Sequence, residues 1–224
     1  MSKQVGSSGV ITGAGIAGVN RFSITMAAES PEKTVMGAAV KAFMAGITSF
    51  NFEAEGIGET PSLAETFTVS EGNLKSFDIE GVADTQDVTA IGDVGADDLP
   101  FRSFIAGLAE WTANLNCDFE GAVPQRGAEY TFAGAAGIIT SVSVNGEVNG
   151  LINATLQIKG KGALPTGVNT AGTTINFSVA CASGAIASGA AIVTSSKISG
   201  SVGGLITYSV NSQGTGELTI GEAA

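Results

Sequence analysis

The sequence predicts a mainly β, antiparallel fold with one or two short helices. Apolar and polar residues alternate in several separate runs, which is the pattern of half-buried strands. Glycine makes up 32 of the 224 residues, about twice its usual share. Two Asn-Gly pairs, Asn145-Gly146 and Asn149-Gly150, separate two of the alternating runs and favour a hairpin between them. Many strands with few helices favour antiparallel pairing over repeated βαβ units.

The clearest strand lies within residues 111–120. Trp111 and Leu115 fall on one face of this segment and alternate with polar residues such as Asn114. We expect the apolar face to be buried and the polar face to meet water. The same period of two predicts strands at 138–145, 152–159, 175–181 and 206–210, with shorter ones at 22–26, 67–69 and 77–79.

Two segments break this alternation and predict short helices. The first runs from Ser30 to Gly46, where a Ser-Pro pair caps the start, apolar residues recur along one face and glycine closes the end. The second runs from Asp98 to Gly107 and has similar punctuation. Each is expected to bury one apolar face.

The composition excludes several classes of enzyme. The chain contains no histidine, so it cannot form a Ser-His-Asp or Cys-His site and is a poor candidate for zinc binding. No other constellation of acid, base and nucleophile stands out. We therefore expect no enzymatic activity, no cofactor and no metal. We interpret Cys117 and Cys181 as small core residues rather than as a disulfide or a reactive thiol.

The ends of the chain and its hydropathy bear on location. The first residues carry no apolar signal core, so we expect a protein that is made and kept in the cytoplasm. The segment closest to a membrane span, 179–193, is too short and too weakly apolar to cross a bilayer. No membrane partner is expected.

Acidic residues are concentrated in one part of the chain. The formal net charge is −11, and residues 53–98 carry twelve acids against a single base, Lys75. The overall balance argues against an outer surface that holds nucleic acid. Two interpretations of the acidic segment remain open: solvated loops and strand faces, or a negative surface directed at a partner or at passing DNA.

A glycine-rich segment near the start resembles a dinucleotide-binding motif. Residues 13–18 match G-x-G-x-x-G, which requires a following helix to hold a pyrophosphate. Residues 19–26 alternate like a strand instead, and no acid-terminated strand follows at the required distance. We interpret residues 1–19 as a flexible arm, residues 20–221 as one β domain and residues 222–224 as a short tail.

Internal repeats are the strongest signal in the sequence. Residues 140–164 match 194–218 at a constant offset of 54 without a gap. A weaker, gapped match links 21–56 to 76–121; it aligns Phe22 with Phe77, Phe43 with Phe104, Gly46 with Gly107, Phe50 with Trp111, and Glu55-Gly56 with Glu120-Gly121. The order of these segments predicts a nested duplication, in which one β unit is inserted into another and the two sheets superpose.

An ordered series of segments resembles the tail tube (major tail) proteins of long-tailed bacteriophages. The series consists of residues 75–81, 83–89, 92–93, 101–107 and 111–121, then 138–164, and it recurs in 204–218. It covers most of residues 20–221, and the order of the segments carries the resemblance, since no single motif is specific.

The resemblance implies a structural protein of the virion tail, made in the host cytoplasm. It implies an antiparallel β-sandwich or half-barrel whose long hairpins form a β-barrel between subunits. Rings of six subunits would stack into a tube for DNA passage, contacting tape measure and terminator proteins; DNA would pass without specific binding. Because this chain carries doubled elements, three chains are an alternative to six.

The same resemblance, together with largely uncharged polar strand faces, suggests which residues line the channel. The candidates for the lumen are Thr112, Asn114, Asn116, Asp118, Glu120, Glu147, Asn153, Thr155 and Gln157. Segments 6–18 and 83–99 are long loops that we expect to order against the next ring. The candidates for ring-to-ring contacts are Asp84, Asp87, Thr89 and Asp93.

Other classes of protein remain open from the sequence. A capsid decoration or cement protein would form trimers on the head surface and would not polymerise into tubes. A surface adhesin-like β domain is a further alternative, although the chain shows no signal segment and no paired cysteines.

Overall fold

A computed structural model of the chain describes residues 10–12, 19–34, 40–44, 46–58, 73–90, 101–146, 151–165, 168, 170–181, 184–201 and 204–221. These residues form eleven strands and no helix, and all named strand pairs are antiparallel. The strands are β1 (Val10–Thr12), β2 (Val19–Ala28), β3 (Thr48–Gly58), β4 (Asn73–Asp87), β5 (Phe104–Phe119), β6 (Glu129–Phe132), β7 (Ala135–Gly146), β8 (Ile152–Gly160), β9 (Thr174–Cys181), β10 (Gly184–Ser201) and β11 (Ile206–Ile220). The predicted mainly β, antiparallel class is confirmed.

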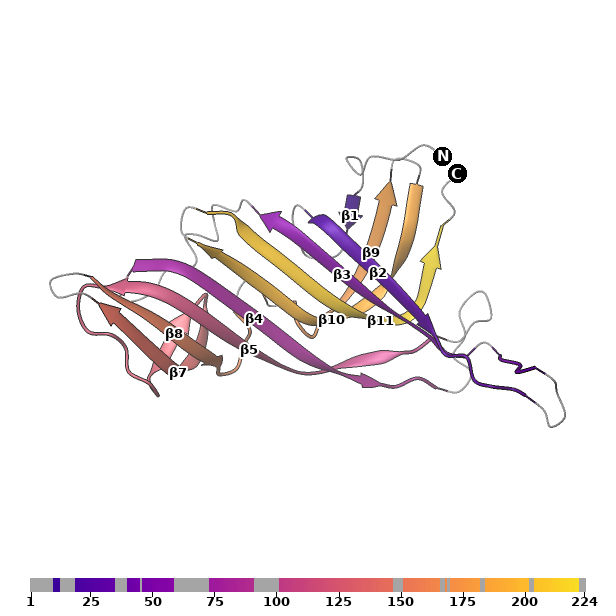
Figure 1. Cartoon of the computed structure of the whole chain (residues 1–224), viewed down its shortest axis with the longest axis horizontal. Helices are drawn as coiled ribbons and strands as arrows, with labels where there is room; N and C mark the ends of the chain where they lie inside the picture. The colour runs from indigo at the N-terminus through magenta and orange to yellow at the C-terminus, as the bar shows by residue number, and fades with distance from the viewer. Residues whose placement is uncertain are drawn as a thin grey trace.

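The strands form one long sheet that consists of two similar units (Figure 1). Unit one has the order β2-β3-β11-β10, with β9 paired to the first part of β10. Unit two has the order β4-β5-β8-β7, with β6 paired to the first part of β7. The second part of β10 pairs with β4 and joins the two units into one sheet.

The two units share their pairing register as well as their strand order. Phe22 pairs with Ala54 in unit one, as Phe77 pairs with Leu115 in unit two. On the next strand of unit one, Val210 pairs with Ala54 and with Ser196. Its equivalent in unit two, Leu156, pairs with Leu115 and with Val142. Irregularities recur at equivalent places, since Asn20 and Lys75 are each skipped in the ladder, as are Thr140 and Thr194. The hydroxyls of these two threonines donate to the backbone carbonyls of Gln157 and Asn211, each at 3.1 Å.

One part of the gapped alignment differs from the observed register. Glu55 and Gly56 were expected to match Glu120 and Gly121, but the pairing makes them equivalent to Asn116 and Cys117. The Glu-Gly likeness is local and lies outside the matching ladders, because Glu120 follows the end of β5.

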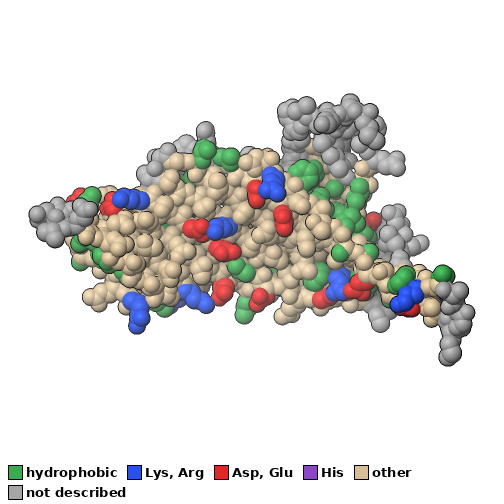
Figure 2. Space-filling model, viewed as in Figure 1, with side chains coloured by type: hydrophobic (Ala, Val, Ile, Leu, Met, Phe, Trp, Pro, Cys, Tyr) green, Lys and Arg blue, Asp and Glu red, His purple; other side chains and the backbone are tan. Residues whose placement is uncertain are grey.

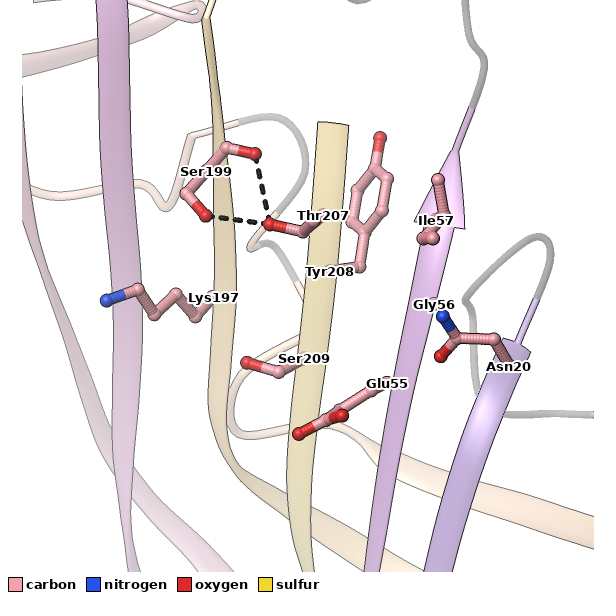
Figure 3. Close-up of a pocket in the computed structure, with 9 residues that line it drawn as sticks. All are labelled: Asn20, Glu55, Gly56, Ile57, Lys197, Ser199, Thr207, Tyr208 and Ser209. Carbon is pink, nitrogen blue, oxygen red and sulfur yellow. Dashed lines mark hydrogen bonds between the residues drawn. The ribbon is translucent and has the colours of Figure 1, made fainter. Parts of the chain in front are cut away.

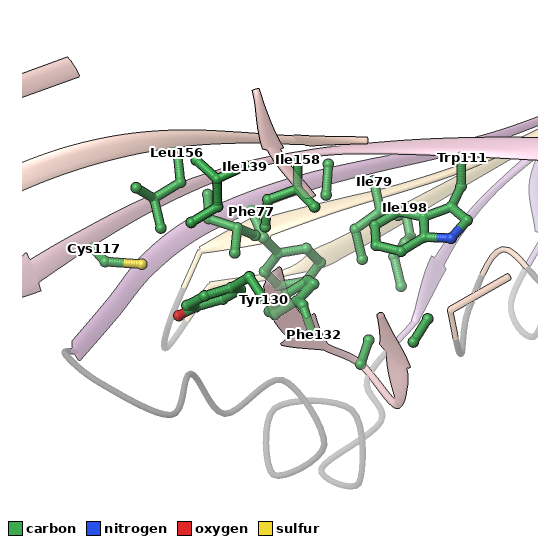
Figure 4. Packing of buried hydrophobic residues seen from close by; sticks show 14 of the residues in the cluster. Phe77, Ile79, Trp111, Cys117, Tyr130, Phe132, Ile139, Leu156, Ile158 and Ile198 are labelled. Atoms are coloured by element: carbon green, nitrogen blue, oxygen red, sulfur yellow. The ribbon is translucent and has the colours of Figure 1, made fainter. Parts of the chain in front are cut away.

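Each unit has its own hydrophobic core on one side of the sheet. In unit two, Trp111 and Leu156 on the long strands belong to one core with Tyr130 and Phe132 of β6, which cover this side of the sheet (Figure 4). In unit one, Phe52 stacks on Phe177 of β9 with ring centroids 4.4 Å apart. The opposite side of the eight long strands has no covering layer among the described residues.

The helix expected from Ser30 to Gly46 is wrong for the described part of that segment. Its two arms extend the β2–β3 hairpin, because Lys33 N donates to Ala42 O at 2.7 Å and Met44 N donates to Pro31 O at 3.1 Å. Val40, Phe43 and Met44 are exposed, so these described residues lack the core contact that would stabilise a short amphipathic helix. Residues 35–39 and 45 lie outside the described residues.

The helix expected from Asp98 to Gly107 is also wrong where the chain is described. Phe104 begins β5, and Phe101 forms an isolated parallel bridge with Thr48. The extended form is favoured because it buries Phe101 in the core of unit one and lets Phe104 N donate to Thr215 Oγ1 at 2.9 Å. Residues 98–100 lie outside the described residues.

Candidate functional site

The uncovered side of the long sheet is a continuous polar face. From Trp111 to Cys117 in β5 the buried residues alternate with exposed or half-buried ones, and the latter point away from the core. The ladders continue this side from strand to strand across the junction between the units. One row of paired residues crosses seven strands: Arg21, Glu55, Ser209, Lys197, Glu80, Thr112 and Lys159.

Most of the residues that the sequence analysis assigned to a lumen lie on this polar face. Those on the face are Thr112, Asn114, Asn116, Asp118, Asn153, Thr155 and Gln157. Glu120 is exposed in the bend after β5, and Glu147 lies outside the described residues. The structure thus brings seven candidates together, and their position in a lumen remains a prediction.

Asp118 is the centre of a polar network on this face. Its Oδ2 lies 2.8 Å from Lys75 Nζ, and its Oδ1 accepts from Asn153 Nδ2 at 3.1 Å. The same Asn153 amide nitrogen donates to Asn116 Oδ1 at 2.7 Å. The hydrogen bond from Lys75, followed by that from Asn153, lowers the pKa of the Asp118 carboxyl. The Asp118 network therefore holds a carboxylate and a cation in a fixed pair.

Every lysine and arginine described on the polar face lies close to a carboxylate. Besides Lys75 with Asp118, the pairs are Arg21 with Glu55 at 3.7 Å, Lys197 with Asp78 at 2.9 Å, and Lys159 with Glu110 at 3.2 Å. The hydrogen bond to Asp78 raises the pKa of Lys197. A phosphate approaching this face would have to compete with a carboxylate already in place at each cation.

The distribution of side chains on one side of the molecule is consistent with this description. Figure 2, in the orientation of Figure 1, shows acidic side chains (red) next to basic ones (blue) over the middle of the sheet. Hydrophobic groups are sparse there and gather toward the ends. The apolar exceptions on the polar face include Ile57, Val82 and Ile138, which are partly exposed.

A pocket opens on the polar face of unit one (Figure 3). It occupies the place that the Asp118 network fills in unit two, because Asn20 and Thr207 are equivalent to Lys75 and Asn153. The hydroxyls of Ser199 and Thr207 bond to each other at 2.8 Å. The pocket offers hydrogen-bonding groups and no activated nucleophile among its residues. Its lining is Asn20, Glu55, Gly56, Ile57, Lys197, Ser199, Thr207, Tyr208 and Ser209.

Three of the four residues assigned to ring-to-ring contacts, Asp84, Asp87 and Thr89, lie toward the far end of the β4–β5 hairpin. Asp87 accepts from Thr89 N at 2.9 Å and from Arg102 Nη1 at 2.8 Å, and Arg102 also pairs with Glu29. The bonds from Thr89, together with Arg102, lower the pKa of Asp87. Asp84 is exposed on β4, so the loop expected over 83–99 is wrong for residues 83–87, and Asp93 lies outside the described residues. Their role between rings remains a prediction.

Strands that pair between subunits, with edges in residues 138–160, were expected from the sequence, but the sequence did not locate the two free edges of the sheet. Among the described strands, β2 pairs only with β3, and residues 141–146 of β7 pair only with β8. Phe22 and Met26 on β2 and Val144 on β7 are exposed at these edges. Unpaired edges with apolar side chains are sites for pairing with another chain. The internal repeats bear on these edges, because β10 and β4, the equivalents of β7 and β2, pair with each other inside the chain.

Several kinds of site are not found in the described part of the chain. No group of three or more Cys, Asp or Glu side chains there is arranged to hold a metal ion. None of its segments is a helix long and apolar enough to cross a membrane. Cys117 is buried, as expected, and burial raises the pKa of its thiol to about 11. The side chain of Cys181 lies outside the described residues.

Comparison with known proteins gives no assignment. No family model matches the chain, and no curated protein matches its sequence. The polar face and the free edges are therefore the basis for a functional proposal.

Proposed function

We propose that this chain is a structural subunit of a bacteriophage tail tube. Copies join through their free sheet edges into rings, and the rings stack into a tube whose polar face lines a channel for DNA. In this proposal the sheet is a segment of a β-barrel shared between subunits, and the layers formed by β6 and β9 lie outside it. A ring contains six chains, or three chains that each supply two units.

The observation that carries the proposal is the largely polar face, which continues across the junction between the units and whose cations are paired with carboxylates. A channel for a polyanion has to stay hydrated while offering few phosphate-binding sites, because neutralisation of phosphates by lysine and arginine drives DNA binding. Amide and hydroxyl side chains supply hydration, and the cation of Lys197 is already neutralised by Asp78. Neighbouring carboxylates such as Glu53 and Glu80 leave a net negative charge on this face.

The free edges support assembly over a monomeric role. A closed barrel is one of the few ways to remove unpaired strand edges entirely. The edges formed by β2 and by 141–146 of β7 lie at opposite ends of the row of eight long strands, β2-β3-β11-β10-β4-β5-β8-β7. This arrangement suits head-to-tail joining, which generates rings when the rotation closes. A tape measure protein would occupy the channel, and a terminator protein would cap it.

Electron microscopy of the purified protein tests this proposal against its strongest alternative. Tubes with a regular axial repeat and a stain-filled channel are expected. Isolated trimers that never stack would contradict the proposal and favour a decoration protein of the capsid. A protein that stays monomeric at high concentration would contradict both.

A further inference from the structure

We propose that neighbouring copies join through the same interface that joins the two units within one chain, with 141–146 of β7 paired to β2 of the next copy. The inference rests on the proposed self-assembly and adds its register and contacts. It follows from the internal repetition of the structure and does not depend on whether rings stack.

The template is the pairing of β10 with β4. Ile198 lies opposite Ile79 at this junction, and both side chains are 0% exposed. The strand equivalent to β10 in unit two is β7, and the strand equivalent to β4 in unit one is β2. These are the two strands whose edges are free, so each copy carries both halves of a second junction.

The template fixes the register between copies. Val144 takes the place of Ile198 and Ile24 that of Ile79, so these two residues face each other across the new junction. Val144 is 52% exposed in the single chain, whereas its equivalent Ile198 is fully buried. In the same register Asn145 lies opposite Ser23, as Ser199 lies opposite Asp78 within the chain.

A second contact involves the tips of the two long hairpins. The tip of unit one contains Glu32 and the tip of unit two contains Asp87, and the two carboxylates have equivalent partners. Lys41 Nζ lies 3.0 Å from Glu32 Oε2, and Arg102 Nη1 lies 2.8 Å from Asp87 Oδ2. Thr34 and Thr89 form hydrogen bonds with the carboxylates of Glu32 and Asp87, respectively. The backbone bonds Lys33 N to Ala42 O and Val88 N to Ser103 O are also equivalent. The two tips are therefore equivalent down to their hydrogen bonds.

Among the described residues of the two tips, those of unit two are packed within the chain and Val40 of unit one is not. The tip of unit two reaches onto unit one, where Phe101 is 7% exposed and Arg102 O accepts from Gly216 N at 3.0 Å. In the tip of unit one the equivalent of Phe101 is Val40, which is 77% exposed. The equivalent of Gly216 is Gly162, which has the same left-handed backbone, with φ of 96° against 77°. We expect Val40 to pack beside Gly162 on unit two of the neighbouring copy whose β7 pairs with β2 of this chain.

Disulfide trapping tests the register. In the double variant Ser23→Cys, Asn145→Cys, directly opposite residues approach within the Cα distance of about 4.4–6.8 Å that a disulfide needs. Mild oxidation is expected to give a ladder of covalent multimers that ends at the number of chains in a ring. The matched control Ser23→Cys, Ser143→Cys is two residues out of register, and it and the single variants are expected to give no ladder. Equal ladders from both pairs, or none from the first pair in assembled protein, would overturn the proposed register.

Apolar-to-acid substitutions test the two contacts separately. Val144→Asp and Val40→Asp are each expected to lower the assembled fraction in sedimentation by at least tenfold, with the unfolding temperature of the monomer unchanged. Leu205→Asp, at an exposed residue outside both contacts, is the control and should assemble normally. Normal assembly of both test variants would overturn the inference. Cross-linked rings that do not stack would contradict the proposed tube and support this interface. Tubes that form without the cross-link would support the proposed tube and contradict this interface.

Discussion

Gly160 on β8 lies directly against the indole ring of Trp111, and a Cβ atom at this position would overlap the ring. The same relationship recurs in unit one, where Gly214 lies against the ring of Phe50. Both rings are almost completely buried, so neither can move aside without disturbing a core. In both units a glycine therefore lies against a buried aromatic ring, which lets β8 at Gly160 and β11 at Gly214 approach their cores closely.

Alanine at either glycine should destabilise the fold. We expect Gly160→Ala and Gly214→Ala each to lower the free energy of unfolding by about 1–3 kcal/mol through overpacking. Urea denaturation of the unassembled protein measures this change. Gly121→Ala is the matched control, because its Cβ would meet nothing within 4 Å, and a change within about 0.5 kcal/mol is expected. Equal effects at all three positions would show that the ring contacts are unimportant.

Releasing cations on the polar face should create DNA binding. The double variant Glu55→Gln, Asp78→Asn removes the carboxylates that pair with Arg21 and Lys197 and leaves Glu80 opposite Lys197. We expect assembled variant protein to bind duplex DNA with a log-log salt slope of about −0.9 for each phosphate contacted, whereas the unsubstituted protein shows no measurable binding. Fluorescence anisotropy of labelled DNA measures both.

The control for that experiment is Glu129→Gln. It frees Lys161, whose amine lies 3.2 Å from Glu129 at the start of β6, the strand whose Tyr130 and Phe132 cover the core of unit two. No gain in binding inside tubes is expected from this change. Tight DNA binding by the unsubstituted protein would contradict the proposed character of the channel.

The Asp118 network should make stability depend on pH in the acid range. The folded-state pKa of Asp118 is lowered, so the unfolded chain binds more protons between that value and the ordinary pKa near 3.9. The stabilisation is complete above the ordinary pKa and is lost as the pH falls through the folded-state pKa. The gap in urea midpoint between the unsubstituted protein and Asp118→Asn should therefore close in that window.

Lys75→Met provides the complementary measurement for this network. It removes the largest cause of the lowered pKa, the hydrogen bond from Lys75, and should shrink the acid-dependent part of the stability. A gap between the unsubstituted protein and Asp118→Asn that persists unchanged when the pH falls below the folded-state pKa of Asp118 would show that the carboxylate charge contributes nothing.

Cys117 should be unreactive in the folded protein. Its side chain is fully buried, and a thiol with a pKa of about 11 is roughly one part in a thousand thiolate at pH 8. We expect alkylation of Cys117 by iodoacetamide to be at least a hundredfold slower in the folded protein than in urea, as measured by peptide mass spectrometry. Similar rates in both states would show that the core of unit two opens readily.

The strands were predictable wherever one face of the sheet is buried. Trp111 to Phe119 and Ile152 to Ile158 alternate because each strand has a core side and a water side, and both predictions are confirmed. The hairpin between β7 and β8 is confirmed by their pairing, although its turn lies outside the described residues, as does the short strand expected at 67–69.

The errors concern features that depend on partners far away in the sequence. The Ser30-Pro31 start and the Gly46 end are typical of a helix, but the same residues suit the arms of a hairpin whose bonds form with the opposite arm. The skipped position of Lys75 in the ladder, which lets it reach Asp118, follows from strand register and not from local composition. The free edges depend on which strands pair, so no local pattern predicts them.

A reconstruction of the assembled protein by electron cryo-microscopy, at a resolution that traces strands, tests the central claim most directly. The account predicts a closed barrel in which each chain contributes eight adjacent strands, with Asn114 and Lys197 facing the channel. A reconstruction in which these side chains face outward, or in which β2 and β7 remain unpaired between copies, would contradict it.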